Sequence, residues 1–133
     1  MNSYYHDYNN VLRYAASLAG EHGEVITAPG GRIDVQHKTK WSPRTQSVID
    51  FVVDEDKRGK GLGDALLKKA LAKYSDLGGQ VSSLASLKVF HNNGFRHPEL
   101  PSGSFEDHVK AFKDEGGSLF MAHKDDNGEP YVK

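Results

Sequence analysis

The stretch that most restricts the fold is VVDEDKRGKGLGDALLKK, residues 52–69, where an apolar segment runs through glycines into a helical pattern. The apolar segment is QSVIDFVV, residues 46–53, and Asp50 is its one charged residue. Such a run, apolar on both faces, is typical of a central strand. The junction after it alternates glycine with other residues, in the order Gly59, Lys60, Gly61, Leu62 and Gly63. A strand followed at once by a helix predicts a mixed α/β domain.

The glycines have a chemical use at the start of a helix. A helix N-terminus presents N–H groups without partners and carries a partial positive charge. Glycines there remove side chains that would keep a ligand from those donors, while Lys57, Arg58 and Lys60 add positive charge. This combination is typical of a pyrophosphate site. It is neither a Walker A motif nor a dinucleotide-binding motif, since Leu66 replaces the third glycine of the latter. The alternative is a glycine-rich surface turn with solvated charges.

The remaining pattern predicts further helices and strands. Residues 8–22 have the spacing of an amphipathic helix. Two strands are expected in EVITAPGGRIDVQHKTKW, residues 24–41, around the turn Pro29-Gly30-Gly31, and with 46–53 they form a meander. The polar face of the second strand is expected to face water, with Arg32, Asp34, Gln36, Lys38 and Lys40. A helix at 62–74 is expected to end at Gly78-Gly79. Later elements are a short strand QVSS (80–83), a helix LASLKVFHNN (84–93) closed by Gly94, a helix SFEDHVKAFKDE (104–115) and a strand SLFMAHK (118–124).

Composition limits the classes of function. The 133 residues are expected to form one domain, 1–133, with 125–133 as a tail. Lysine and arginine number 17 and acidic residues 18, so the charge makes no case for nucleic acid. No run is long enough for a membrane helix, and no signal peptide is present, so a cytoplasmic location is expected. The chain has no cysteine, and its seven histidines have no metal-ligand spacing, so no metal site is expected.

Two motifs resemble a known family. R-x-x-G-x-G at 58–63 resembles the Arg/Gln-x-x-Gly-x-Gly/Ala signature of the GNAT superfamily of acyl-CoA-dependent N-acyltransferases. SLASLKVFHNNGFR, residues 83–96, resembles the helix that follows in that family and ends in a Gly-Phe pair. The resemblance covers residues 46–96. It implies a mixed, mostly antiparallel sheet flanked by helices, in which two central strands splay apart around coenzyme A.

The resemblance also implies the reactants and the cofactor-binding residues. Acetyl-CoA would be the acyl donor, and an unidentified primary amine on a small molecule or protein the acceptor. Main-chain groups of the central strand would bind the pantetheine arm, and those of 58–63 the pyrophosphate. The cofactor-binding residues expected on this basis are Phe51, Val52, Val53, Arg58, Gly59, Lys60, Gly61, Leu62, Gly63, Ser83 and Phe90.

Catalytic groups are less defined. The family often has a tyrosine four residues before the glycine of the Gly-Phe pair, as a proton donor to the leaving thiolate. This chain has Phe90 there, and a phenyl ring cannot donate a proton. The remaining candidates for the acid are His91, Tyr74, Tyr131 and Ser83. For a base, Asp50 is the one carboxylate inside the central strand and Glu55 lies just beyond it. The alternative for Asp50 is a carboxylate satisfied by a neighbouring cation or hydroxyl.

One length departs from the family. Gly94 follows Gly63 by 31 residues, several fewer than the family usually has there. The shortening must fall on the strand and loop that form the far wall of the cofactor gap. Together with Phe90, it keeps open a second function, a weakened or inactive module that binds coenzyme A or a protein partner. A monomer and a homodimer are both compatible with the sequence.

Overall fold

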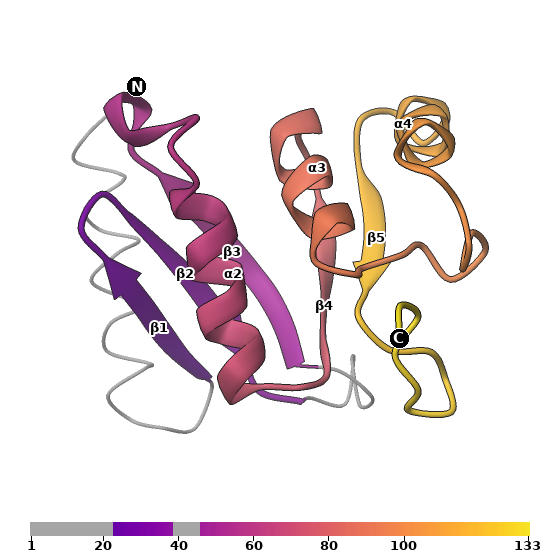
Figure 1. Ribbon diagram of the computed structural model, residues 1–133, viewed down its shortest axis with the longest axis horizontal. Helices are drawn as coiled ribbons and strands as arrows, with labels where there is room; N and C mark the ends of the chain where they lie inside the picture. The colour runs from indigo at the N-terminus through magenta and orange to yellow at the C-terminus, as the bar shows by residue number, and fades with distance from the viewer. Residues whose placement is uncertain (1–22, 39–45) are drawn as a thin grey trace.

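The computed structural model describes residues 23–38 and 46–133, which form a five-stranded sheet with helices packed on it (Figure 1). The helix predicted at 8–22 and the strand residues Thr39 to Trp41 lie outside the described residues. The strands are β1 Gly23–Ala28, β2 Gly31–Gln36, β3 Gln46–Val53, β4 Leu77–Val81 and β5 Leu119–Ala122. The helices are the 3-10 helix η1 Glu55–Lys57, α2 Leu62–Lys73, α3 Leu84–Asn92 and α4 Phe105–Asp114. The sheet order follows the chain, β1-β2-β3-β4-β5, and every neighbouring pair except β3–β4 is antiparallel. The predicted mixed, mostly antiparallel fold is therefore confirmed.

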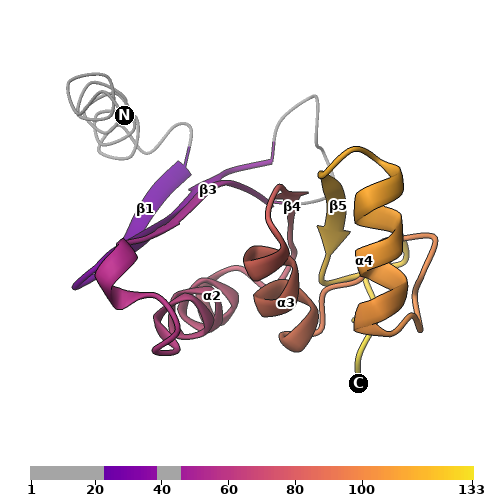
Figure 2. The same ribbon diagram turned by 90° about the horizontal axis from the view of Figure 1, so that it is seen from above.

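The front half of the sheet is the predicted meander. β1 and β2 pair antiparallel across a turn in which Gly30 has φ +91°, a conformation that glycine adopts without the steric cost of a side chain. β2 then pairs antiparallel with β3, with Ile33 opposite Phe51. α2 and α3 cover one face of this sheet, and α4 lies beside β5 (Figure 2).

The expectation that the polar face of β2 faces water is wrong at Asp34, whose exposed fraction is 2%. Asp34 lies directly opposite Asp50, where the register between β2 and β3 shifts. Arg32 lies beside both carboxylates, with its Nε 3.7 Å from Asp34 Oδ1 and its NH2 nitrogen 3.1 Å from Asp50 Oδ2. Because one guanidinium lies beside both carboxylates, these charged side chains can be partly or fully buried on a face of β2 that the alternation of polar and apolar residues assigns to solvent.

Gly78 and Gly79 do not end the second helix, as the pattern predicted. α2 ends at Lys73, and both glycines lie in β4. A Cβ atom on Gly79 would lie 2.9 Å from the carbonyl oxygen of Val48, closer than ordinary contact allows. Gly79 is therefore needed because β3 and β4 approach closely there, whereas Gly78 faces β5, where a Cβ would lie 3.1 Å from the ring of Phe120. The strand predicted at QVSS begins three residues earlier, at Leu77.

The two later helices are confirmed. α3 begins after Ser83, whose hydroxyl accepts the N–H of Ser86, and the chain leaves it through Gly94 with φ +85°. α4 begins with a capping box, in which the hydroxyl of Ser104 and the carboxylate of Asp107 each accept the other residue's N–H. Both caps satisfy N–H groups that a helix end leaves without partners.

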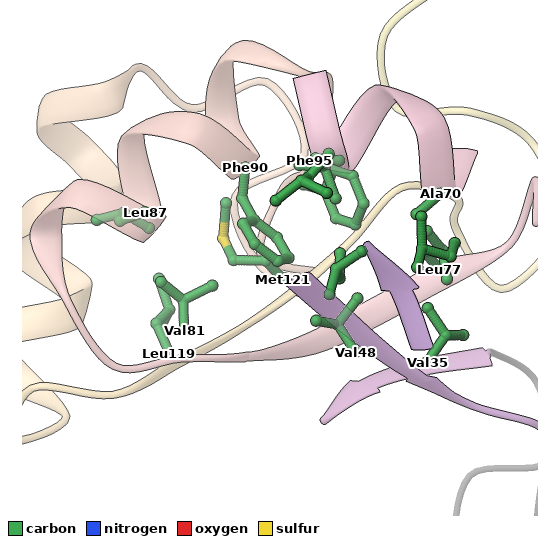
Figure 3. Packing of buried hydrophobic residues seen from close by; sticks show 14 of the residues in the cluster. Val35, Val48, Ala70, Leu77, Val81, Leu87, Phe90, Phe95, Leu119 and Met121 are labelled. Atoms are coloured by element: carbon green, nitrogen blue, oxygen red, sulfur yellow. The ribbon is translucent and has the colours of Figure 1, made fainter. Parts of the chain in front are cut away.

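The core lies between the sheet and the helices. Val35 and Val48 from the sheet, Leu77 from β4 and Met121 from β5 gather with the rings of Phe90 and Phe95 from α3 and the residues after it (Figure 3). Phe95 is fully buried, and its ring centroid lies 4.8 Å from that of Phe90. The phenylalanine of the Gly-Phe pair is thus a central residue of the core.

The segment predicted as a tail folds back on the sheet. The N–H of Tyr131 donates to the carbonyl of His123, and Lys124 forms an isolated bridge with Pro130. Within residues 23–38 and 46–133, no helix has the length and apolar character needed to cross a membrane.

A fully buried histidine fixes α4 to the rest of the fold. Nδ1 of His108 donates to the carbonyl of Ser104 at 2.8 Å, and Nε2 accepts the N–H of His97 at 3.0 Å. Because Nε2 accepts, the ring in this arrangement is neutral. Burial lowers the pKa of His108 below its usual 6.5, although the hydrogen bond to the Ser104 backbone acts in the opposite direction.

This histidine predicts a loss of stability in acid. The unfolded chain takes up the proton first, so the contribution of His108 is complete above about pH 6.5 and is lost as the pH falls toward the lowered folded-state pKa. We expect the free energy of unfolding in urea to decrease in that range, by at most about 1.4 kcal/mol per pH unit for one proton. The variant His108→Gln, which cannot titrate, should show a shallower dependence. Equal slopes for the two proteins would contradict this assignment.

Candidate functional site

A cavity of about 350 Å³ opens where β3 and β4 separate. Among the residues that the structure describes, the two parallel strands are in register at Gln46–Leu77 and Ser47–Gly78, near the start of β3. The cavity is lined by Phe51, Val52 and Val53 of β3, by Arg58 and Gly63 at the start of α2, and by Ser83, Ala85, Ser86 and Val89 at the start of α3. The predicted splay of the central strands therefore holds, and it creates a space between two helices.

One wall of the cavity is the N-terminus of α2, and it is free of side-chain caps. Gly61 is the N-cap residue with φ +80°, and no side chain hydrogen-bonds to the cap. The first intrahelical bond runs from Ala65 N–H to the Gly61 carbonyl, so the N–H groups before Ala65 have no acceptor within the helix. A Cβ added at Gly59 or Gly61 would meet no atom within 4 Å. The space in front of these donors is open, which fits an anionic group such as a pyrophosphate.

Arg58 joins this loop to the strand. Its Nε donates to the carbonyl oxygen of Val53, the last residue of β3, at 3.1 Å. Gly63 packs against the same strand, since a Cβ there would lie 3.2 Å from the ring of Phe51. Lys57 and Lys60 are exposed nearby. The structure thus brings together the strand end, the glycine loop and the cations, as the motif predicted.

The second wall, formed by α3, was only partly predicted. The Ser83 hydroxyl accepts the Ser86 N–H at 3.1 Å and donates to Ser86 Oγ at 2.9 Å. Of the residues in this wall, Ser83 was predicted from the sequence, whereas Ala85, Ser86 and Val89 were not. Their helical spacing after Ser83 places them on α3, but this spacing does not predict which face of α3 lines the cavity.

A comparison with family models identifies the family of this chain. The family model described as "Acetyltransferase (GNAT) family" matches residues 3–98. The chain belongs to the GNAT acetyltransferase family. Among solved structures, the IAA acetyltransferase from Bacillus cereus ATCC 14579 is 22% identical, with a TM-score of 0.49 over 69% of this chain and 67% of that one. Nourseothricin acetyltransferase is also 22% identical, with a TM-score of 0.47 over 70% of this chain and 56% of that one. A comparison with curated proteins found no match.

In this GNAT domain, Phe90 is a core residue behind the cavity. Its exposed fraction is 3%, and its ring packs edge-on against Phe51, at 5.9 Å between centroids, and against Phe95. Phe90 is absent from the cavity lining, whereas Phe51 contributes to it. The ring therefore supports the wall and offers no proton.

Asp50 is held away from the cavity wall. Its Oδ2 accepts from Arg32 at 3.1 Å, and its Oδ1 accepts the Phe51 N–H at 3.0 Å. This is the arrangement given above as the alternative to a base, a carboxylate satisfied by a neighbouring cation. Glu55 lies in η1 and is exposed.

The acid candidates are spread over the molecule. His91 points toward α4, with Nε2 3.0 Å from the Gly103 carbonyl oxygen and its ring 4.9 Å from that of His108. Tyr74 hydrogen-bonds to Glu24 near the far end of α2, and burial together with this bond raises its pKa to about 12. Tyr131 lines a separate cavity near β5. Ser83 is the member of this group that lines the cavity between α2 and α3.

That separate cavity, of about 550 Å³, lies beside β5 and the segment that folds back after it. Its charged side chains are largely engaged, with Lys38 paired to Asp76 at 3.4 Å and Lys124 donating to Ser75 at 3.4 Å. Within residues 23–38 and 46–133, no three His, Asp or Glu side chains gather as a metal site.

Proposed function

We propose that this GNAT domain transfers an acetyl group from acetyl-CoA to a primary amine on a small molecule or a protein. The observation that carries the proposal is the cavity at the divergence of β3 and β4, with the uncapped N-terminus of α2 in its wall. A nucleotide-linked thiol carrier has the two chemical parts that such a wall can bind. One is an anionic pyrophosphate and the other an extended amide-containing arm.

The geometry supports a proposal for the residues that would hold acetyl-CoA. The N–H groups from Gly59 to Gly63 would bind the pyrophosphate, because a Cβ at Gly59 or Gly61 would meet no atom within 4 Å, and Lys57 and Lys60 would add positive charge. At Phe51 to Val53, the Phe51 N–H and the Val53 carbonyl already have partners in Asp50 and Arg58. The remaining main-chain groups of this edge of β3 would hydrogen-bond the pantetheine arm as an added strand does. Arg58 would fix the loop to the end of that strand. When bound, acetyl-CoA supplies the acetyl group as an activated thioester.

The protein's own contribution is positioning and proton transfer. A lysine-like amine with a pKa near 10.4 is neutral in only about one molecule in 2,500 at pH 7, so the acceptor must lose a proton before it attacks. Because Asp50 is paired with Arg32, we assign it the role of fixing β3 and leave the acceptor's proton to water. The Ser83 and Ser86 hydroxyls, which hydrogen-bond to each other in the cavity wall, are the proposed route by which a proton reaches the leaving sulfur.

The test is an assay of thiol release from acetyl-CoA with a panel of primary amines, run beside thermal unfolding with and without acetyl-CoA. We expect stabilisation by acetyl-CoA and amine-dependent thiol release, with the acetylated amine found by mass spectrometry. Absence of any stabilisation would contradict the proposal.

A second candidate function is a module that binds coenzyme A but no longer turns it over. It is favoured by Phe90, a buried residue at the sequence position where the family often has a proton-donating tyrosine. Loss of one general acid typically costs 10² to 10⁴ in rate. Stabilisation by acetyl-CoA without thiol release for any amine would favour this module over the enzyme.

A further inference from the structure

Asn93, directly after α3, forms a side-chain link between the two helices that flank the cavity. Its Nδ2 donates to Asp64 Oδ1 at 2.7 Å and to the Val89 carbonyl oxygen at 2.8 Å. Its backbone N–H is also bound, by the Val89 and Phe90 carbonyls at 3.2 and 3.1 Å. The side chain is therefore held at both its backbone and its amide, and it presents one fixed donor to α2.

The two ends of this link lie next to the cavity lining. Val89 lines the α3 wall, and Asp64 directly follows Gly63, which lines the α2 wall. Among residues 23–38 and 46–133, no other side-chain hydrogen bond joins α2 to α3 or its cap. We therefore expect that loss of this bond changes the distance between the two walls of the cavity.

Asp64 is suited to act as a fixed acceptor. Hydrogen bonds from Lys68, four residues along α2, and from Asn93 lower its pKa, so it is a carboxylate at neutral pH. Its side chain is 41% exposed, and a hydrogen bond at such a position contributes little to overall stability. A bond that contributes little to stability but joins two walls of a site affects that site mainly by fixing the distance between the walls.

We propose that Asn93 and Asp64 form a positioning pair that sets the separation of α2 and α3, and so the width of the proposed coenzyme A cavity. The inference rests on the proposed function. Neither side chain lines the cavity, so both act through the helices that do: Asn93 through α3 and its Val89, Asp64 through α2 and its Gly63.

The test compares coenzyme A affinity, measured by calorimetry, with thermal stability in the absence of ligand. Asn93→Ala removes the donor, and we expect the Kd to rise about 3- to 5-fold, within the contribution of one partly exposed charged hydrogen bond. Asp64→Asn keeps an oxygen acceptor for Asn93 and should stay within about 2-fold of the wild type. Lys68→Ala is the matched control, because it removes the other partner of Asp64 without touching α3.

A second set of variants tests the same bond in case Asn93→Ala folds poorly. Asp64→Ala removes the same bond at an exposed position, and its Kd should rise similarly; the double variant should be no weaker than Asn93→Ala alone. If Asn93→Ala lowers the melting temperature and leaves the Kd unchanged, the role is structural and the inference is wrong. Additive losses in the double variant would also overturn it. No binding by the wild type would overturn the proposed function and this inference together, whereas binding insensitive to both variants overturns this inference alone.

Discussion

Replacing Gly61 with glutamate is expected to abolish the thermal stabilisation that coenzyme A gives to the wild-type protein. Gly61 is the N-cap residue of α2, and the space in front of it is open. A glutamate there would place a side chain and a negative charge where the pyrophosphate is proposed to bind. Like charges placed together cost several kcal/mol, which corresponds to a loss of affinity of about 100-fold or more. The measurement is the melting temperature across a coenzyme A titration.

The control for this variant must separate strain from charge. Gly61 has φ +80°, so any side chain there costs about 1 to 2 kcal/mol in backbone strain. Gly116 has φ +82° and equally open space, but it lies after α4 and away from the cavity. Gly116→Glu should therefore lose similar stability and keep the full response to coenzyme A. A response that survives in Gly61→Glu would show that the glycine loop is not the phosphate site.

Replacing Phe95 with alanine is expected to cost about 3 to 5 kcal/mol of unfolding free energy. Phe95 is fully buried, and its ring contacts the rings of Phe90 at 4.8 Å and His123 at 5.3 Å between centroids. Its removal leaves a cavity among groups from α3 and β5 that cannot collapse without moving the sheet. Urea denaturation measures the change.

The comparison for Phe95→Ala is Val132→Ala, because Val132 is 47% exposed and should cost less than about 1 kcal/mol. A loss below about 1 kcal/mol for Phe95→Ala would mean that the Gly-Phe pair does not pack in the core as described. It would also remove the support that the motif gives to the placement of α3.

Local pattern was sufficient for the parts of the fold that depend on neighbouring residues. β3 was predictable because eight residues at 46–53 have no polar alternation, and α2 because its apolar stripe starts directly after the glycines. Gly78-Gly79 was misread because a glycine pair after a helix usually marks its end. Here Gly79 is required by the approach of Val48 in β3 and Gly78 by the approach of Phe120 in β5, and both contacts join residues that are far apart in the sequence.

The site also has a part that local sequence predicts and a part that it does not. The uncapped helix N-terminus follows from the order of glycines and cations in residues 57–63 and was predicted. The α3 wall depends on how far β3 and β4 diverge, which is a property of the sheet. The partner of Asp50 could not be predicted from the sequence either. Arg32 lies eighteen residues away, and the register of β2 against β3 brings the two side chains together. Nor does the motif contain the Asn93–Asp64 link, whose members are 29 residues apart.

The central claim is that main-chain N–H groups at the start of α2 bind the pyrophosphate of coenzyme A. Amide chemical shifts of the ¹⁵N-labelled protein, followed during a coenzyme A titration, test it residue by residue. The account predicts that the largest changes fall on Gly59 to Asp64 and on Val53, and that the amide shifts of Asp125 to Glu129 and of Tyr131 do not change. Changes confined to that distant segment, or none at the glycine loop at saturation, would contradict it.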